Sequence, residues 1–377
     1  MKYSKTRAII AMILLFCSYF PYLGIPYLSG VMQDYYLPIY VIGCIILLLL
    51  FSKSTHMAIK KKQLALLFAA ILFCIVCYVI NDISYGNMIT IICTMVFLYI
   101  FSESIIDKNG KKIILALSLL VTTILVVTSF SVVKKFYSGL SILNPNALAQ
   151  LLLLCLITIS QLTNNNKIRI FFSIIIIVGI FNCESRTILV ISLLYTVYVL
   201  IKKIFNNKLD KKRIRALYIL VVALGIIIPL IYVFLYTNSY SISTSLFEKN
   251  IYSGRERIWA VVLNEIKRPR NMLTGVPTVT YSDKVYTLNM HNIYITILAN
   301  YGILFFIIFY RNIYQKIASI HNDNTYCITI GILAILLAGT FENILFSMEI
   351  NYIICFLFSL KTKNMINMDE NKQLLQI

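Results

Sequence analysis

Long apolar runs constrain this chain of 377 residues more than any other feature. Hydrophobic residues make up 59% of the sequence and charged residues only 13%, about half the share of roughly 25% in soluble domains. This composition excludes a soluble globular enzyme, a disordered chain and a secreted disulfide scaffold. A helix needs about 20 apolar residues to cross a membrane, and twelve runs are candidates: 8–28, 36–51, 64–80, 88–101, 113–133, 142–160, 168–182, 187–201, 215–236, 293–309, 326–341 and 344–360. We therefore expect an all-α integral membrane protein with about twelve transmembrane helices, in which residues 1–377 form a single polytopic domain.

The distribution of basic residues predicts the orientation of these helices. With the N-terminus in the cytoplasm, 24 of the 34 Lys and Arg residues fall on cytoplasmic segments, as the positive-inside rule requires. We expect a multi-pass protein of the cytoplasmic (plasma) membrane with both termini in the cytoplasm and residues 361–377 as a cytoplasmic tail. The net charge of +19 then follows from topology, and no nucleic-acid partner is expected.

One expected outer segment, residues 237–292, is much longer than the others. Long loops escape the positive-inside rule, so its net charge of +3 is free to serve function. The sequence from Ser253 to Glu256 predicts a capping box that opens a short amphipathic helix, which Pro269 would end. Trp259, the only Trp of the chain, is expected to anchor this helix at the outer membrane interface. Residues 237–292 are therefore the expected extracytoplasmic catalytic loop.

The nine cysteines do not indicate a metal site or a disulfide. Cys74 and Cys77 have CxxC spacing, but no second pair or His cluster accompanies them. The chain also has no DxD motif, no Walker loop and no GxSxG motif. We expect neither a metal nor another cofactor.

Arginines on the outer face are the first candidates for chemistry, because charges near membrane spans are costly and often functional. Arg186 lies in a very short turn, and Arg255 and Arg257 flank Glu256 at the start of the amphipathic helix. Each could simply contact lipid headgroups, or Arg186 could pair with Glu184. The functional alternative is a planar, fixed guanidinium that binds a phosphate-bearing substrate.

His291 is the candidate general base, since the ordinary pKa of a histidine, ~6.5, suits proton transfer near neutrality. A lone His at a membrane interface is more often structural. Glu184 and Glu256 each stand beside an Arg in the sequence, which favours lowered basicity and orienting roles. Two Arg could stabilise a departing pyrophosphate, while a neutral His accepts the proton of an attacking sugar hydroxyl.

Two other groups of polar residues stand at the outer ends of predicted spans. Asn144, Pro145 and Asn146 open the sixth apolar run, where an Asn cap and a proline are also ordinary helix-start residues. Glu342 and Glu349 lie at the outer end of the last two runs. Either could pair with Arg186 or with another Arg.

The order of these motifs resembles the O-antigen ligase / Wzy-type polysaccharide polymerase superfamily over about residues 140–310. The resemblance implies a GT-C-like glycosyltransferase fold, lipid-linked sugar donors and no required metal. It also implies Arg186, Arg255 and His291 as catalytic residues, and we expect Asn146, Glu184, Arg257, Asn292 and Tyr294 to bind the substrate. The matching segments are 144–150, 184–187, 254–259, 291–294 and 300–303.

Polymerase and ligase share these motifs, so the resemblance leaves both open. A polymerase would join repeat units carried on undecaprenyl pyrophosphate into capsular polysaccharide, exopolysaccharide or O-antigen, whereas a ligase would transfer finished glycan to another acceptor. The abundance of Ile, Lys, Asn and Tyr is typical of A+T-rich bacteria and hints at a Gram-positive source, which has no lipid A core and favours the polymerase. The alternative from another class is a lipid-linked oligosaccharide flippase. Expected partners are the lipid-linked donor and acceptor and membrane lipids, with a flippase and a chain-length regulator as further candidates.

Overall fold

The computed structural model describes residues 5–19, 36–53, 61–137, 144–163, 165–205, 210–238, 254–277, 290–322 and 324–361, which form fourteen α-helices and two short 3-10 helices. Each of the twelve predicted apolar runs carries a helix. The helices are α1 (Lys5–Tyr19), α3 (Tyr36–Lys53), α4 (Lys61–Asn81), α5 (Tyr85–Glu103), α6 (Lys108–Tyr137), α7 (Pro145–Leu162), α8 (Asn166–Asn182), α9 (Arg186–Phe205), α10 (Lys211–Thr237), α14 (Ile293–Ile320), α15 (Tyr326–Ala338) and α16 (Met348–Leu357). The remaining elements are α11 (Arg255–Ile266), α12 (Pro269–Thr274), η3 (Ile344–Phe346) and η4 (Phe358–Leu360).

Six of the described helices, namely α4, α5, α6, α7, α10 and α14, are long and apolar enough to cross a membrane. The all-helical, multi-pass architecture is thus confirmed, while the total of twelve spans stays a prediction. Exposed apolar side chains such as Phe68, Leu72 and Val79 on α4 suit contact with lipid tails. By contrast, α5, α7 and α14 are mostly buried and form the centre of the bundle.

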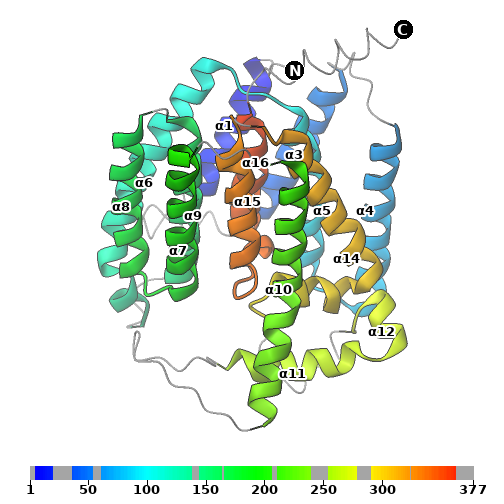
Figure 1. Cartoon of the computed structure of the whole chain (residues 1–377). Coiled ribbons are helices and arrows are strands. Elements are labelled where there is room, and N and C mark those ends of the chain that lie inside the picture. Colours follow the sequence, from blue (N-terminus) through cyan, green and yellow to red (C-terminus); the bar gives the residue numbers. More distant parts are fainter. Residues whose placement is uncertain are drawn as a thin grey trace.

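The helices run back and forth across the bundle, and α11 and α12 lie together at one of its ends (Figure 1). Both belong to the predicted catalytic loop, of which residues 239–253 and 278–289 lie outside the described residues. The helix α11 packs against α10 and α14, and α12 packs against α14. The described part of the loop is therefore docked onto the bundle.

A break in α14 allows α12 to pack closely against it. Gly302 has φ 73° and ψ −179° inside the helix, a conformation that L-residues rarely adopt. A Cβ atom at Gly302 would collide with the backbone of Leu273 and Thr274. Because glycine lacks that atom, α12 approaches the interrupted α14 backbone directly.

The Asn81 side chain stabilises the junction between α12 and α14. Its Nδ2 donates hydrogen bonds to the carbonyls of Thr274, at 2.6 Å, and Asn300, at 3.0 Å. The backbone N–H of Val276 adds a bond of 2.6 Å to the Ala299 carbonyl. These contacts give partners to carbonyls at the end of α12 and just before the break in α14, and they fix α12 against the end of α4 and the first part of α14.

Two expectations for α11 were wrong in detail. The residue that caps the helix is Gly254, with φ 79° and no side-chain cap hydrogen bond, and Ser253 lies outside the described residues. Trp259 is completely buried rather than exposed at the membrane interface. Its Nε1 donates a hydrogen bond of 2.6 Å to the Met290 carbonyl, and its ring lies against those of Tyr232 and Phe341. A buried indole needs a partner for its N–H, and the chain just before α14 supplies it.

Replacing Gly302 with Ala should destabilise the fold. The backbone conformation alone costs about 1–3 kcal/mol for an L-residue, and the collision with α12 adds to it. We expect a clearly lower unfolding temperature for the purified protein in detergent. Gly86→Ala is the matched control, since a Cβ at Gly86 meets no atom within 4 Å. Equal unfolding temperatures for the two variants would contradict this account of the break.

The orientation of the bundle is testable with two exposed positions on the described helices. Asn264 on α11 and Lys212 at the start of α10 are both exposed, and the expected topology places them on opposite sides of the membrane. We expect an impermeant thiol reagent to label Asn264→Cys in intact cells and Lys212→Cys only after lysis. The reverse pattern would overturn the expected orientation.

Candidate active site

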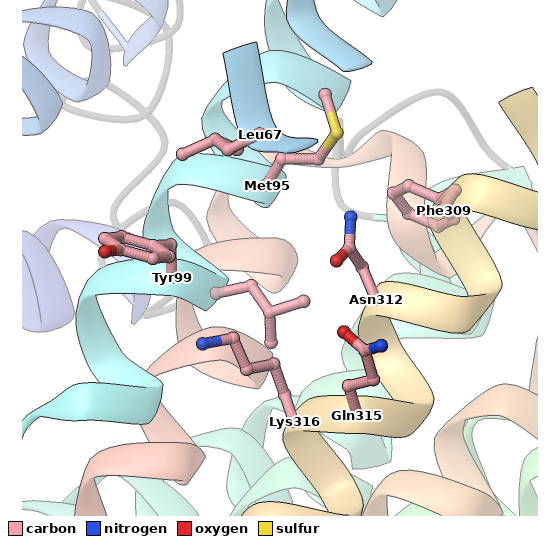
Figure 2. Close-up of a pocket in the computed structure, with 8 residues that line it drawn as sticks. Leu67, Met95, Tyr99, Phe309, Asn312, Gln315 and Lys316 are labelled. Atoms are coloured by element: carbon pink, nitrogen blue, oxygen red, sulfur yellow. The ribbon is translucent and has the colours of Figure 1, made fainter. Parts of the chain in front are cut away.

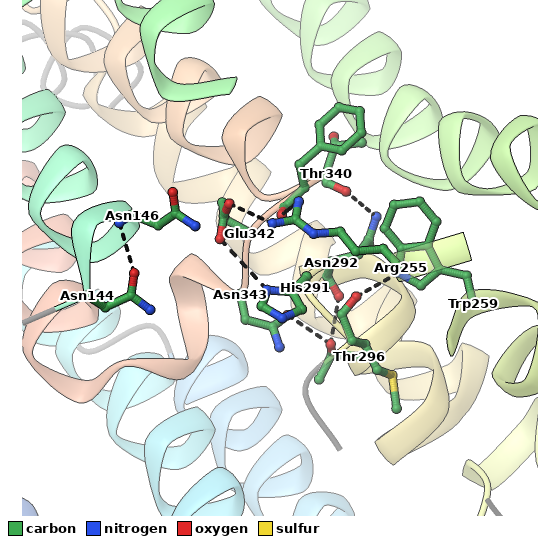
Figure 3. A network of polar contacts seen from close by, with 12 residues as sticks. Asn144, Asn146, Arg255, Trp259, His291, Asn292, Thr296, Thr340, Glu342 and Asn343 are labelled. Carbon is green, nitrogen blue, oxygen red and sulfur yellow. Dashed lines mark hydrogen bonds and ion pairs between the residues drawn. The ribbon is translucent and has the colours of Figure 1, made fainter. Parts of the chain in front are cut away.

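One carboxylate brings together two of the three residues that the sequence predicted to be catalytic. The Arg255 Nη2 lies 3.1 Å from Glu342 Oε1, and the His291 Nδ1 lies 4.0 Å from Glu342 Oε2. Arg255 also donates a hydrogen bond from Nη1 to the Phe341 carbonyl. Figure 3 shows the two side chains reaching Glu342 from separate segments. We call Arg255, His291 and Glu342 the ionic cluster.

The three side chains of the ionic cluster are buried to different extents. The side chain of Glu342 is 8% exposed, that of Arg255 18% and that of His291 34%. A carboxylate so deeply buried needs a charged or hydrogen-bonding partner, and Arg255 provides it. His291 remains the most accessible of the three, as a group that meets a substrate must be.

The position of His291 follows from the way α14 begins. Asn292 is the N-cap, and its Oδ1 accepts a hydrogen bond of 2.8 Å from Ile295 N. Its Nδ2 donates to the Thr340 carbonyl at 2.7 Å and to the Gly225 carbonyl at 3.1 Å. His291 itself has φ 48°, a strained conformation of the kind that clusters at functional sites. The cap thus turns His291 out of the helix and ties it to the segment that carries Glu342.

Tyr294, in the first turn of α14, stabilises the start of the same helix. Its hydroxyl donates to the Leu336 carbonyl at 2.8 Å, and its ring stacks on Tyr310 with centroids 5.1 Å apart. Gly225 on α10 leaves the space that this ring fills. Asn292 and Tyr294, both predicted to bind the substrate, are completely buried with their polar atoms bonded inside the protein. Their observed contacts position His291.

Asn146 approaches the ionic cluster from α7. Asn144 caps this helix, accepting a hydrogen bond of 2.9 Å from Asn146 N, and Pro145 is its first residue. Asn144 and Pro145 therefore do serve as ordinary helix-start residues. The Asn146 side chain is half-buried and points toward Glu342 (Figure 3), so it can also line a site there.

Arg186 and Glu184 lie in the turn between α8 and α9. Glu184 has φ 53°, and Arg186 is the first residue of α9 and is half-buried. The helix α9 packs against α7 and α15, which flank Asn146 and Glu342. A role for Arg186 or Glu184 in catalysis stays a prediction.

The residues on either side of Arg255 face other surroundings. Arg257 is exposed, because two helical positions turn it to a different face. Glu256 is buried, and this burial raises the pKa of its carboxyl group. The expectation of lowered basicity for Glu256 was wrong, because Arg255 pairs with Glu342 and Arg257 points outward. Glu256 is thus a second group able to accept a proton, but at 6% exposure it is far less accessible than His291.

Within the described residues, no three His, Cys, Asp or Glu side chains are grouped so that they could hold a metal ion. The expected metal independence stays a prediction. The ionic cluster itself offers a guanidinium and an imidazole that face the same carboxylate.

Part of the chain matches a known protein family. Residues 170–310 match the family model Wzy_C, O-antigen ligase. The match confirms the resemblance seen in the sequence motifs. No curated protein matches the chain. The Wzy_C region contains Arg186, Arg255 and His291, whereas Glu342 and Asn146 lie outside it. The match covers residues 170–310 of the 377 residues, and the model is described as an O-antigen ligase.

Sequence reasoning left the role of Glu342 open. It placed this carboxylate at the outer end of the last apolar runs but could not choose its partner. The available signal was a single acidic residue between two long apolar stretches, where a charge needs compensation. The structure identifies Arg255 as that compensating charge.

Replacing Glu342 with Gln should impair the site even though it changes few atoms. The variant removes the charge that holds Arg255 and faces His291, and a shift of about 1 Å in a positioned group can cost ~10²-fold in rate. We expect glycosyl transfer to fall ~10- to 100-fold, with protein abundance in the membrane as the accompanying measurement. Glu349→Gln is the control, because Glu349 accepts a hydrogen bond from Ser347 and is not part of the ionic cluster. Equal activity of the two variants would contradict the role of Glu342.

Proposed function

We propose that this protein is a polysaccharide polymerase, which joins oligosaccharide repeat units carried on undecaprenyl pyrophosphate at the outer face of the cytoplasmic membrane. The observation that carries the proposal is the ionic cluster, which pairs an Arg and an accessible His of the Wzy_C region through one buried carboxylate. It lies where the docked loop meets α14, beside the end of the membrane bundle. A lipid-anchored pyrophosphate could present its sugar there.

Arg255 is the proposed stabiliser of the leaving group. A guanidinium carries five N–H donors in a planar fork suited to phosphate. In the described part of the chain, its hydrogen bonds go to Phe341 and Glu342, which leaves donors for a ligand. Arg186 is proposed to add a second positive charge from α9. Together they would offset the charge that develops on the departing lipid pyrophosphate.

His291 is the proposed general base. Its Nδ1 lies 4.0 Å from Glu342 Oε2, and its side chain is the most exposed of the ionic cluster. As the acceptor hydroxyl attacks the anomeric carbon, the new glycosidic bond forms and the bond to the pyrophosphate oxygen breaks. The hydroxyl proton passes to His291, and the pyrophosphate leaves on its lipid. The negative charge of Glu342 stabilises the imidazolium that results.

Substrate contacts are proposed around this centre. Asn146 is directed toward the ionic cluster (Figure 3). Arg257, which is exposed on another face of α11, is proposed to contact the lipid or the sugar from that side. Glu184 is proposed to orient Arg186. Asn292 and Tyr294 contribute by holding His291 rather than by touching the sugar.

The second candidate is an O-antigen ligase, favoured by the description of the matching family. The amino-acid composition is typical of A+T-rich bacteria and hints at a Gram-positive source. This favours the polymerase, because a Gram-positive cell has no lipid A core to accept the glycan. A flippase is less well supported. Transporters commonly place ions at broken helices near the bilayer midplane, whereas the break in α14 is filled by Asn81 and α12.

Deletion of the gene separates these functions. Electrophoresis of the envelope polysaccharide should show single repeat units if the protein is a polymerase. Full-length chains that remain unattached would identify a ligase, and loss of all surface repeats would identify a flippase. A polymerase also requires the lipid-linked donor and acceptor as substrates, with a flippase and a chain-length regulator as proposed partners.

Substitutions in the ionic cluster test the chemistry. Arg255→Lys keeps the charge but loses the planar fork, and His291→Ala removes the base. We expect each to lower the polymerisation rate ~10²-fold or more, while His291→Ala still binds the lipid-linked donor. Arg257→Lys is the control, because the exposed Arg257 should tolerate the change with a much smaller loss. Near-normal polymer after His291→Ala would refute the base role and leave leaving-group stabilisation as the main catalytic device.

A further inference from the structure

The helix α12 lies at the level where the membrane span of α4 ends. Asn81 is the last residue of that span, and its side chain donates hydrogen bonds to the Thr274 carbonyl at the end of α12 and to the Asn300 carbonyl. Figure 1 shows α12 next to the end of α4. A segment bonded to the end of a membrane span lies near the boundary between lipid tails and headgroups. The bundle therefore holds α12 at the membrane surface.

The exposed side chains of α12 include two large apolar ones. Met272 is 47% exposed and Leu273 is 45% exposed. On α4, Val79 and Ile80 directly precede Asn81 and are 71% and 42% exposed, as suits side chains that face lipid tails. Because Asn81 joins the two helices, the exposed apolar residues of α12 adjoin the lipid-facing end of α4. The bilayer is therefore the occupant that this apolar surface indicates.

Basic residues stand directly before these apolar residues. Lys267, Arg268 and Arg270 are all exposed, and residues 267–277 include no acidic residue. Arg268 pairs with Glu265 at 3.2 Å, whereas Lys267 and Arg270 form no ion pair within the described residues. Positive charge beside exposed apolar side chains is typical of a segment that lies in a membrane surface. This charge is complementary to acidic lipid headgroups.

The other end of α14 shows a cation that is neutralised inside the protein instead. There Lys316 lies 3.0 Å from Glu103 Oε1 and 4.9 Å from the centroid of the Tyr99 ring, and it points across toward α5 (Figure 2). The exposed Lys267 and Arg270 have no such carboxylate in their own segment. They are therefore available to anions outside the protein.

We propose that α12 lies in the membrane leaflet on the side of the ionic cluster, with acidic phospholipid headgroups as its partner. Met272 and Leu273 enter the lipid tails beside the end of α4, while Lys267 and Arg270 contact headgroup phosphates. The membrane contact expected of Trp259, which is buried, is thus made by α12. This contact holds the docked loop at the bilayer surface, and it does not depend on the reaction catalysed at the ionic cluster.

Spin labels on added cysteines test this contact in the full-length protein, reconstituted into vesicles. Eight of the nine native cysteines are buried, so an added surface thiol is labelled selectively. A label on Leu273→Cys should be accessible to oxygen, which dissolves in lipid tails, and shielded from a water-soluble nickel chelate. Met272→Cys should give the same result, which keeps the test valid if one variant fails to fold. Asn264→Cys is the control, because Asn264 shares an exposed polar face of α11 with Arg257. Its ratio of oxygen to chelate accessibility should be several times lower.

The lipid composition of the vesicles tests the headgroup partner. The label on Leu273→Cys should lie deeper in vesicles that contain phosphatidylglycerol than in pure phosphatidylcholine, and adding Lys267→Gln with Arg270→Gln should remove this difference. Arg311→Gln is the matched control, since Arg311 is exposed toward the other end of α14, and it should keep the difference. Equal depth in the two kinds of vesicle would overturn the proposal.

Two other results would also overturn it. A Leu273 label as accessible to the chelate as the Asn264 label would place α12 in water. A Leu273 label shielded from both oxygen and the chelate would show that protein, such as a second copy of this chain, covers α12 instead of lipid.

Discussion

The candidate site depends on the contacts that the Glu342 carboxylate makes with Arg255 and His291. This carboxylate lies between α15 and η3, outside the Wzy_C region, yet it contacts Arg255 at the start of α11 and faces His291 before α14. Buried at 8% exposure, it would be costly without a cation. The same charge therefore sets the distance between a guanidinium and an imidazole. The proposed glycosyl transfer from a lipid pyrophosphate uses both groups.

The structure surrounding Glu342 holds these groups in place by packing and hydrogen bonding. Asn292 joins the start of α14 to α10 and to the segment that carries Glu342. Trp259 fixes α11 on the chain before α14, and the α14 break at Gly302 receives α12. Rigid elements of this kind position reactive groups better than a free loop does.

Sequence alone predicted the features that depend on local pattern. The apolar runs predicted the helices because length and hydropathy determine what crosses a bilayer, and the motif order led to the Wzy_C region. Arg255 and His291 were found because isolated charges are conspicuous near membrane spans. The burial of Trp259, the partner of Glu342 and the raised pKa of Glu256 were not predictable, since each depends on segments that are distant in the chain. The break at Gly302 gave no clear signal, because a single glycine in an apolar run is also compatible with an unbroken helix.

The most direct test of this account is a double-mutant cycle between Glu342 and Arg255. Polymerisation rates would be measured for purified wild type, Glu342→Gln, Arg255→Lys and the double variant, under conditions where all four are folded. If the carboxylate acts by holding the guanidinium, the double variant should lose little more rate than the worse single variant, because residues that act as a unit are non-additive. Losses that multiply would show two independent contributions and contradict the shared-carboxylate site.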